Sequence, residues 1–369
     1  MILNSEFQID GCGGATELTN SNERTLSSVL VAGGAGYIGG HTAKALQRAG
    51  FLPVVLDNLC TGDPTAQRFG PFFHGSLTDS ALIAHIVETH QPVAAMLFAG
   101  HAYVGESTQN PRKYFRNNVA DSISFLDSLM DCGVKNVVFS SSCSVYGNPR
   151  VLPLREESET IPLSPYGETK LFLEKVLRWY GNAYGLRSVC LRYFNAAGAD
   201  PEGELGEVHN PETHLIPLAI QSALAGTPLQ IFGTDYDTPD GTATRDYTHV
   251  SDLAEGHLKA LRYLLDDGQS SIINLGTGSG NSIHQVIQAV ESYTGLRIAA
   301  EYQPRREGDA AVLVADTSRA QATLGWFPRH SSLSTIVQTA VDWAKERREL
   351  PGSDSITNAS SSVVQPASS

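Results

Sequence analysis

A glycine-rich turn between a strand-like run and a helix-like segment is the feature that most constrains how this chain can fold. Residues 28–32 (SVLVA) are β-prone, residues 33–39 (GGAGYIG) follow, and residues 41–50 (HTAKALQRAG) have helical spacing with a closing glycine. The turn satisfies both G-x-G-x-x-G and the wider G-x-x-G-x-x-G pattern. Such glycines allow a tight turn and close approach of a pyrophosphate, and the helix N-terminus offers free amides to that anion. The pattern predicts a dinucleotide-binding fold.

The end of the second β-prone run indicates which dinucleotide is bound. Residues 53–56 (PVVL) lead into Asp57, about 21 residues beyond Gly36. An acidic side chain at this point can accept hydrogen bonds from the adenosine ribose and would repel a 2′-phosphate. We therefore expect NAD rather than NADP, the alternative being that Asp57 only caps a loop.

Further apolar runs predict the fold class. Residues 93–99, 136–140 and 188–193 are buried-strand candidates separated by helical stretches. Alternation of this kind predicts an α/β protein with a doubly wound parallel sheet, a Rossmann-type αβα sandwich, joined to a second, smaller α/β domain. Ligands bind at the carboxyl ends of such strands. The polar residues that follow two of these runs, Ser140–Ser142 and Asn195, should therefore share a crevice with the glycine turn.

A tyrosine and a lysine form the candidate catalytic pair. Residues 164–170 (SPYGETK) suit the start of a helix, with Ser164 as N-cap, and the spacing of four places Tyr166 and Lys170 on one helical face. Free tyrosine, with a pKa of about 10, is too weakly ionised to act as a base near neutral pH. We expect the Lys170 ammonium and a positive nicotinamide to lower the pKa of Tyr166, while Ser142 holds the substrate hydroxyl or the tyrosine oxygen. The alternative is a surface tyrosine stacked on a lysine stem.

Composition excludes several other classes of function. With 26 basic and 39 acidic residues the net charge is −13, which disfavours a nucleic-acid partner. No apolar run approaches the roughly 18 residues of a membrane span. The five cysteines are scattered without a C-x-x-C pair, so we expect neither disulfides nor zinc and favour a reducing cytoplasm. No metal site is expected, because no ligand spacing with cysteines or carboxylates is apparent around four histidines: His41, His101, His209 and His214.

Taken together, these motifs give the chain a family resemblance over about residues 29–345. It resembles the extended short-chain dehydrogenase/reductase family, and within it the enzymes that invert C4 of a UDP-sugar. The motifs that carry the resemblance are GGAGYIGGHT (33–42), LDNL (56–59), FAGHAYVGES (98–107), NNV (117–119), FSSSCSVYG (139–147), SPYGETK (164–170), LRYFNAAGAD (191–200), PETHLIP (211–217), DGTATRDYTHVSDLAEGH (240–257), NLGTGSGNS (274–282) and PRREGD (304–309). The resemblance implies interconversion of UDP-galactose and UDP-glucose through a transient 4-keto sugar, with NAD tightly bound, in a homodimer.

The resemblance also implies a role for individual residues. Tyr166 would be the catalytic base, Lys170 its electrostatic partner and Ser142 the hydroxyl anchor. The residues implied to bind NAD are Gly33, Gly36, Tyr37, Ile38, Gly39, Asp57, Asn58, Leu77, Phe98, Ala99, Asn117, Tyr166, Lys170 and Phe194. The residues implied to hold the UDP-sugar are Ser142, Tyr166, Asn195, His214, Leu215, Phe232, Arg245, Tyr247, Arg306 and Asp309. On chemical grounds, the two arginines supply positive charge for a diphosphate, the alternative being that both are surface charges.

Some positions depart from the family pattern or leave the substrate open. Ser76 and Ala102 stand where an aspartate and a lysine are common near NAD, and His214 replaces an asparagine. Smaller departures are Ala32 and Gly40. Leu313 lies where side-chain bulk limits the 2-substituent of the sugar, which leaves N-acetylated sugars undecided.

Several other functions remain open alternatives. The same machinery would serve a 4-epimerase of UDP-xylose and UDP-arabinose, of a UDP-N-acetylhexosamine or of a UDP-uronate. A nucleotide-sugar 4,6-dehydratase would need a carboxylate beside the serine position, where this chain has Ser142-Cys143-Ser144. A non-enzymatic NAD-sensing module would be expected to lack Tyr166 or Lys170.

The chain is expected to divide into four parts. Residues 1–27 and 349–369 are polar and aperiodic and are predicted to be a disordered extension and tail. Residues 28–195 would form the NAD-binding domain and residues 196–348 the UDP-sugar-binding domain. Strands near residues 246–250 and 272–274 are candidates for returning to the first domain.

Overall fold

The predicted parallel sheet forms the centre of the molecule. The computed structural model describes residues 26–306 and 309–349, so the expected extension and tail lie almost entirely outside the described residues. In the described part a seven-stranded sheet, parallel throughout, runs from one edge to the other in the order β11 (Ser271–Leu275), β6 (Arg187–Tyr193), β5 (Asn136–Ser142), β4 (Ala94–Leu97), β1 (Ser28–Ala32), β2 (Leu52–Asp57) and β3 (Phe72–His74). The predicted α/β fold class is confirmed.

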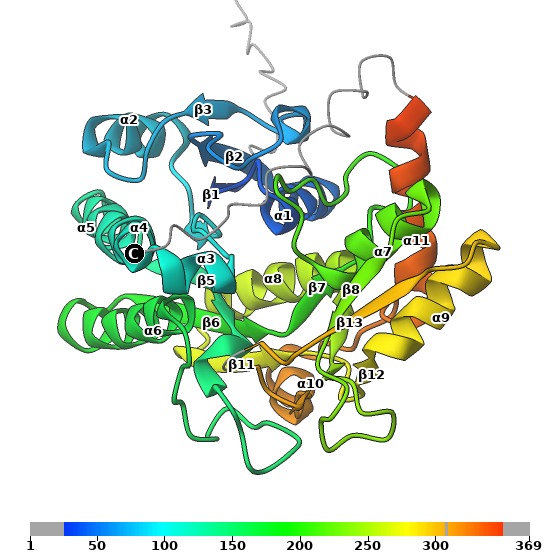
Figure 1. Ribbon diagram of the computed structural model, residues 1–369. Helices are drawn as coiled ribbons and strands as arrows, with labels where there is room; N and C mark the ends of the chain where they lie inside the picture. The colour runs from blue at the N-terminus through cyan, green and yellow to red at the C-terminus, as the bar shows by residue number, and fades with distance from the viewer. Residues whose placement is uncertain (1–25, 307–308, 350–369) are drawn as a thin grey trace, which may run out of the picture.

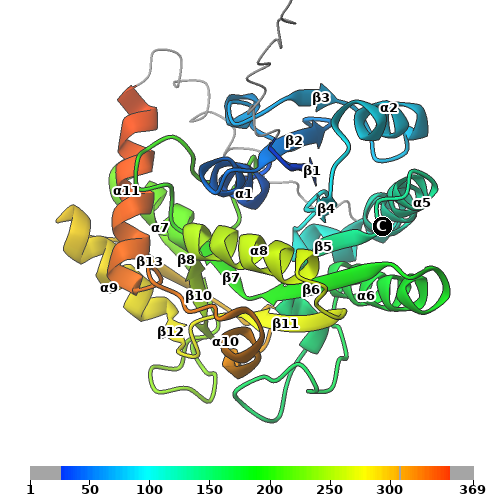
Figure 2. The same ribbon diagram turned by 180° about the vertical axis from the view of Figure 1, so that it is seen from behind.

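The central strands are uninterrupted runs of apolar residues because helices cover both faces of the sheet. Along β1, Val29 and Val31 belong to one core, whereas Leu30 belongs to the core on the opposite face. The first face packs on α1 (Tyr37–Arg48) and α8 (Val250–Leu265). The second face packs on α2 (Ser80–His90), α5 (Ser122–Asp131) and α6 (Pro165–Tyr184), and Figures 1 and 2 show the resulting three layers.

The order of the strands fixes the place of a ligand crevice. β1 lies between β2 and β4. The chain therefore continues to one side of β1 through β2 and β3, and to the other side through β4, β5 and β6. The loops that follow β1 and β4 run in opposite directions and leave a crevice between them. Short segments follow β2 and β4 along this edge. They are the 3₁₀ turn Pro64–Ala66, α3 (Val104–Gln109), α4 (Pro111–Tyr114) and the π-helical segment Phe115–Asp121, and a further 3₁₀ turn, Cys143–Tyr146, follows β5.

Most of the second half of the chain packs around a separate core. This core joins α7 (Leu215–Ala225), α9 (Ile283–Thr294) and α11 (Leu333–Glu349). Small sheets surround it: β7 (Asn195–Ala197) with β10 (Tyr247–His249), β8 (Leu229–Phe232) with β13 (Ala300–Gln303), and β9 (Thr244–Arg245) between β12 (Asn281–Ser282) and β14 (Val312–Leu313). None of the described helices is long and apolar enough to cross a membrane.

The two halves are interleaved in sequence. β11 pairs with β6 at the edge of the central sheet, as predicted for residues 272–274, and α8 and α10 (Ser318–Leu324) contribute to the core on the first face. The strand near residues 246–250 pairs with β7 and does not enter the central sheet. A division at residue 195 therefore remains a prediction about sequence segments, since residues beyond it help to complete the first layer.

Candidate active site

One large cleft collects the predicted site residues. A cavity of about 1410 Å³ opens at the carboxyl ends of the central strands, and every residue assigned to NAD or to the UDP-sugar lines it. Gly33, Asp57, Phe98 and Phe194 come from the ends of central strands, whereas the substrate-side residues other than Ser142 and Tyr166 come from the second half of the chain. Ser76, Ala102 and Leu313 also line the cleft. Folding thus brings together residues almost 280 positions apart, Gly33 and Asp309 among them.

The glycine turn has the geometry that its motif predicted. Gly33 has φ +83°, and a Cβ there would lie 2.4 Å from the backbone nitrogen of Ala99. A Cβ on Gly39 would lie 2.2 Å from the Gly33 carbonyl oxygen, so the first turn of α1 packs directly on the loop. Because α1 begins at Tyr37, its first amides lack intrahelical partners and lie on the cleft wall. This is a suitable cradle for a pyrophosphate.

Asp57 is held rigidly at the end of β2. Its Oδ2 accepts a hydrogen bond from the Ala35 amide at 2.9 Å, and its Oδ1 accepts one from the Leu59 amide at 2.8 Å. Each carboxylate oxygen keeps a lone pair for a further donor. The side chain is partly exposed on the cleft wall, so a ribose could reach it. These residues fit an NAD molecule: glycines clear the space for its pyrophosphate, and a fixed carboxylate lies beyond them.

The catalytic pair lies on one face of α6, as predicted. Ser164 caps this helix by accepting a hydrogen bond from the Gly167 amide at 3.2 Å, and Pro165 is its first residue. Tyr166 and Lys170 are both buried in the cleft wall, and the Lys170 Nζ lies 5.7 Å from the centre of the Tyr166 ring. The prediction of a shared face is confirmed.

Burial acts on the pKa values of both members of this pair. Burial raises the pKa of Tyr166 to about 12, and a hydrogen bond with Ser142 offsets this only in part. Burial also lowers the pKa of Lys170 to about 8, against the raising effect of Glu174. The Lys170 ammonium donates to the Ser140 carbonyl at 2.8 Å. Burial therefore opposes the expected lowering of the Tyr166 pKa, and the Lys170 ammonium and a positive nicotinamide together would have to outweigh it.

The substrate side of the cleft carries the predicted cations. Arg245 is largely buried and forms an ion pair with Asp309, while the Arg306 guanidinium lies 3.9 Å from the centre of the Phe232 ring. Both arginines line the cleft, Arg245 being largely buried and Arg306 exposed. Arg306 occupies one face of Phe232, which leaves the ring edge and the other face for a base.

The remaining substrate-side residues lie at the starts of elements. Asn195 in β7 stands opposite Tyr247 in β10 in the parallel register of this pair. His214 is the N-cap residue of α7, and Leu215 begins that helix. On the NAD side, Asn117 lies within the π-helical segment and donates to Asn118 Oδ1 at 2.9 Å, an oxygen that also accepts from the His101 amide at 2.8 Å.

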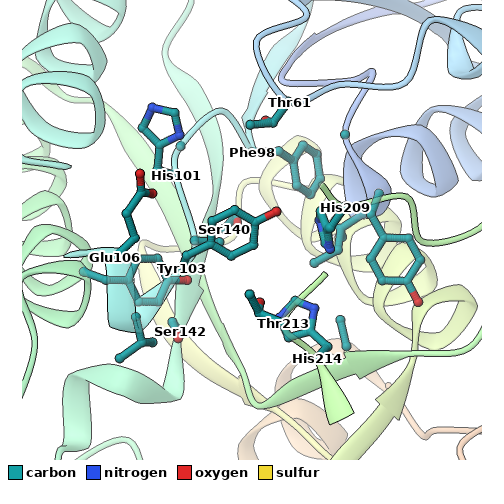
Figure 3. Close-up of a pocket in the computed structure, with 18 of the residues that line it drawn as sticks. Thr61, Phe98, His101, Tyr103, Glu106, Ser140, Ser142, His209, Thr213 and His214 are labelled. Atoms are coloured by element: carbon teal, nitrogen blue, oxygen red, sulfur yellow. The ribbon is translucent and has the colours of Figure 1, made fainter. Parts of the chain in front are cut away.

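Several cleft residues were not predicted from the sequence. His101, Tyr103 and Glu106 line the wall after β4, where Glu106 accepts hydrogen bonds from Lys113 at 2.6 Å and Tyr114 at 2.8 Å. All three lie within the motif FAGHAYVGES, which was the available signal. Figure 3 shows His101 and Glu106 on one side of the cleft and a histidine pair, His209 and His214, on the other.

The fold and the cleft define a class of protein. Three features occur together here: a glycine turn where the strand order of the parallel sheet reverses, an aspartate at the end of the second strand, and a buried Tyr–Lys pair. This combination is typical of a dinucleotide-dependent enzyme of the short-chain dehydrogenase/reductase type. Residues 29–276 match the NAD dependent epimerase/dehydratase family, and the chain belongs to that family. The family resemblance predicted from the motifs is confirmed.

The chain aligns with almost the whole length of individual relatives. The chain is 48% identical to a UDP-glucose 4-epimerase of Halalkalibacterium halodurans over 86% of this chain and 96% of the relative. A crystal structure of the Brucella ovis UDP-glucose 4-epimerase in complex with NAD superimposes with a TM-score of 0.84 at 48% identity, covering 86% of this chain and 98% of the other. The Bifidobacterium longum enzyme in complex with NAD⁺ and UDP gives 0.82 at 36% identity, covering 87% and 98%.

Proposed function

We propose that this protein is a UDP-glucose 4-epimerase, which interconverts UDP-galactose and UDP-glucose with NAD tightly bound. The observation that carries the proposal is the buried set of Tyr166, Lys170 and Ser142, which faces one cleft together with Asp57 and Arg245. These side chains could carry out acid–base chemistry at a point between the glycine turn, where the dinucleotide would bind, and the arginines on the substrate side of the cleft. The relatives that share the fold at up to 48% identity carry this name.

The chain's own residues would handle the proton. Tyr166 would take the proton of the sugar 4-hydroxyl, and Ser142 would orient that hydroxyl. When bound, NAD supplies a hydride acceptor that becomes the donor in the return step, and its oxidised ring carries positive charge. The pKa of Tyr166 has to fall from about 12 as the complete site assembles, and Lys170 is near enough to contribute to that fall.

Anchoring of the UDP group explains how the sugar could be inverted without leaving. Loss of the 4-hydroxyl proton and of the C4 hydride gives a transient 4-keto sugar. Arg245 and Arg306 would hold the UDP group at a distance from the reacting carbon, which lets the sugar turn and present its other face. Tyr166 would then return the proton to the oxygen at C4, and the overall reaction would be redox-neutral and consume no NAD.

The bulk of one cleft residue bears on which UDP-sugars the site could accept. Leu313 in β14 lines the cleft beside Arg245, its partner in the register with β9. A leucine is intermediate in bulk, so a UDP-N-acetylhexosamine stays an alternative substrate beside UDP-xylose, UDP-arabinose and the UDP-uronates. The dehydratase alternative lacks its carboxylate, since the residues after Ser142 are a buried cysteine and Ser144. A pure NAD sensor is disfavoured by the presence of both Tyr166 and Lys170.

The deciding experiment is an assay of the purified protein with UDP-galactose and no added cofactor. Formation of UDP-glucose at a steady rate is the expected result, and kcat/KM for UDP-N-acetylgalactosamine and UDP-arabinose ranks the alternatives. A requirement for NAD in stoichiometric amounts, or no turnover of any of these sugars, would overturn the proposal.

Replacement of the proposed base gives the sharpest mutational test. Tyr166→Phe removes only the hydroxyl, so we expect kcat to fall by about 10²-fold or more while NAD stays bound. Turnover measured with UDP-galactose and the NAD content of the purified variant check both parts. Near-normal turnover would remove Tyr166 from this role.

We also propose a homodimer. α6 leaves Phe172 and Trp179 exposed by 48% and 64%, seven positions apart and thus on one helical face, and the neighbouring Phe115 is 45% exposed. Such a face is suited to the homodimer that the family resemblance implies. We expect Phe172→Glu with Trp179→Glu to give a monomer in sedimentation analysis. An unchanged mass for this double variant, or a monomeric wild type, would refute the interface.

A cytoplasmic location is proposed as well. The four cysteines in the described part of the chain are free thiols. Free thiols in a protein of this size are typical of a reducing compartment.

A further inference from the structure

The loop between β7 and α7 gathers four metal-binding side chains. One donor atom from each of Glu207, His209, Glu212 and His214 lies within 4.8 Å of all the others. The Glu207 Oε1 contacts both histidines: its distance to His209 Nδ1 is 2.9 Å, and it contacts His214 Nδ1 more closely. The Nδ1 of His214 also lies 3.7 Å from the Glu212 Oε1. The pattern E-x-H-x-x-E-x-H within eight residues was the signal in the sequence, and it was not recognised there.

The two carboxylates of this cluster are nearly buried. Their side chains are only 6% and 8% exposed for Glu207 and Glu212. Within the described residues, the ion pairs of these carboxylates are with the two histidines, His209 and His214. Burying two carboxylates is unfavourable unless positive charge compensates them.

A second acidic cluster in the same loop shows how this chain neutralises carboxylates with its own cation. Asp200, Glu202 and Glu204 surround the buried Lys44 Nζ at 2.6, 3.1 and 2.5 Å. The lysine occupies the centre of that cluster. At the Glu207 cluster the donors instead converge on one another, and two of them are imidazoles that can each give a lone pair to a cation.

The donor set selects a class of ion. Two imidazole nitrogens with two carboxylate oxygens suit zinc and similar transition metals, whereas Mg²⁺ and Ca²⁺ prefer oxygen ligands alone. Bonds of about 2.0–2.2 Å to zinc place tetrahedral ligand atoms roughly 3.4 Å apart. The spacing observed here therefore needs only small side-chain rotations to enclose an ion.

The surroundings hold the histidines in place and leave access from the cleft. The His209 ring meets the rings of Tyr37 and Tyr103 edge-on, at centroid distances of 6.4 and 5.7 Å. His209, Glu212 and His214 line the cleft, and Figure 3 shows both histidines on the same side of it. Solvent ions can reach the cluster by this route.

We propose that Glu207, His209, Glu212 and His214 form a binding site for one divalent transition-metal ion of the zinc class. The ion would cross-link residues 207–214 within the loop before α7, whose His209 ring packs against Tyr37 and Tyr103. The proposal concerns ion binding and does not depend on which sugar the cleft accepts.

Calorimetric titration of the untagged, chelator-treated full chain with zinc chloride tests the proposal. Cys60→Ser is used as the background, because Cys60 is an exposed thiol that could bind zinc itself. The expected result is one equivalent of zinc per chain. His209→Gln and Glu207→Gln should each weaken the affinity by at least about 10-fold. Glu204→Gln, in the cluster around Lys44, is the matched control and should bind zinc like the parent.

Cobalt substitution gives an independent readout of the same site. Co²⁺ bound by two histidines and two carboxylates should show visible ligand-field absorption that the His209→Gln protein lacks, while circular dichroism establishes that both proteins are folded. Absence of zinc binding in the parent overturns the proposal, as does equal affinity in the parent and in the folded His209→Gln and Glu207→Gln variants. Since metal content is measured rather than turnover, a negative result leaves the epimerase proposal standing, and a failed epimerase assay leaves this one untouched.

Discussion

At the scale of single residues, a buried ion pair beneath the catalytic helix is the most consequential interaction of the fold. Arg192 in β6 and Glu174 in α6 are both about 3% exposed, and their side chains meet through two contacts of 2.5 and 2.8 Å. Ser141 donates to the same carboxylate at 2.6 Å, and Arg192 also donates to the Tyr146 hydroxyl at 3.0 Å. The pair thus joins β5, β6 and α6 directly behind the catalytic residues.

Breaking this pair should be costly. Glu174→Gln would leave the Arg192 guanidinium buried without its counter-charge, so we expect the free energy of unfolding to fall by about 3–5 kcal/mol. Urea denaturation monitored by circular dichroism measures the change. Glu255→Gln, at the exposed Glu255–Lys259 pair, is the control and should change stability by less than about 1 kcal/mol. Equal effects of the two substitutions would contradict this account.

Residues with local roles could be predicted from the sequence, whereas their charge states could not. Asp57, Tyr166 and Lys170 line one cleft as expected from strand ends, glycine turns and helical spacing, which are local properties, while their roles stay predictions. The raised pKa of Tyr166 depends on burial by segments that are distant in sequence, which no motif encodes. The Glu207 cluster was missed although its spacing is short, because no known motif drew attention to it.

At the scale of elements, the start of α6 controls the position of the catalytic pair. Ser164 caps the helix through the Gly167 amide, and Tyr166 follows two residues later. Ser164→Ala removes this hydrogen bond, so we expect a loss of about 1 kcal/mol in unfolding free energy. Ser164→Asp keeps an acceptor and should recover most of that loss in the same denaturation measurement. A Ser164→Ala protein as stable as the parent would show that the cap is dispensable.

The predicted elements agree with the structure where a strand or helix has its own pattern. β2 and β5 extend the predicted runs by one or two residues, to Leu52–Asp57 and Asn136–Ser142. The π-helical segment Phe115–Asp121 was not predicted, because nothing in its sequence distinguishes it from an ordinary helix. The short strands β9, β12 and β14 are two residues long and form through long-range pairing, so they carry no periodic signal.

At the scale of the whole molecule, three buried histidines make stability depend on pH. Burial lowers the pKa of His41, His249 and His257 to about 4 in each case, from an ordinary value of 6.5. Between pH 6.5 and 4 the unfolded chain therefore binds more protons at these sites than the folded chain does, so stability falls as the pH is lowered.

This linkage can be measured directly. Each histidine should contribute a slope of up to about 1.4 kcal/mol per pH unit in this window, and none well above pH 6.5. Unfolding free energies between pH 7.5 and 4.5 give the slope. His257→Gln should reduce it, whereas His85→Gln, at an exposed position, should leave it unchanged. A slope that is the same in both variants and the parent would refute the assignment to His257.

The return of β11 to the edge of the central sheet bears on how such a protein can be re-engineered. A fragment that ended at residue 195 would leave β6 as a bare edge, without the hydrogen-bonding partner that residues 271–275 provide. The second half of the chain, which would bind the sugar, therefore cannot be removed or exchanged as one independent unit. Grafting a new specificity onto this scaffold would have to retain β11 and α8 from the host while exchanging only the loops and short sheets that face the cleft.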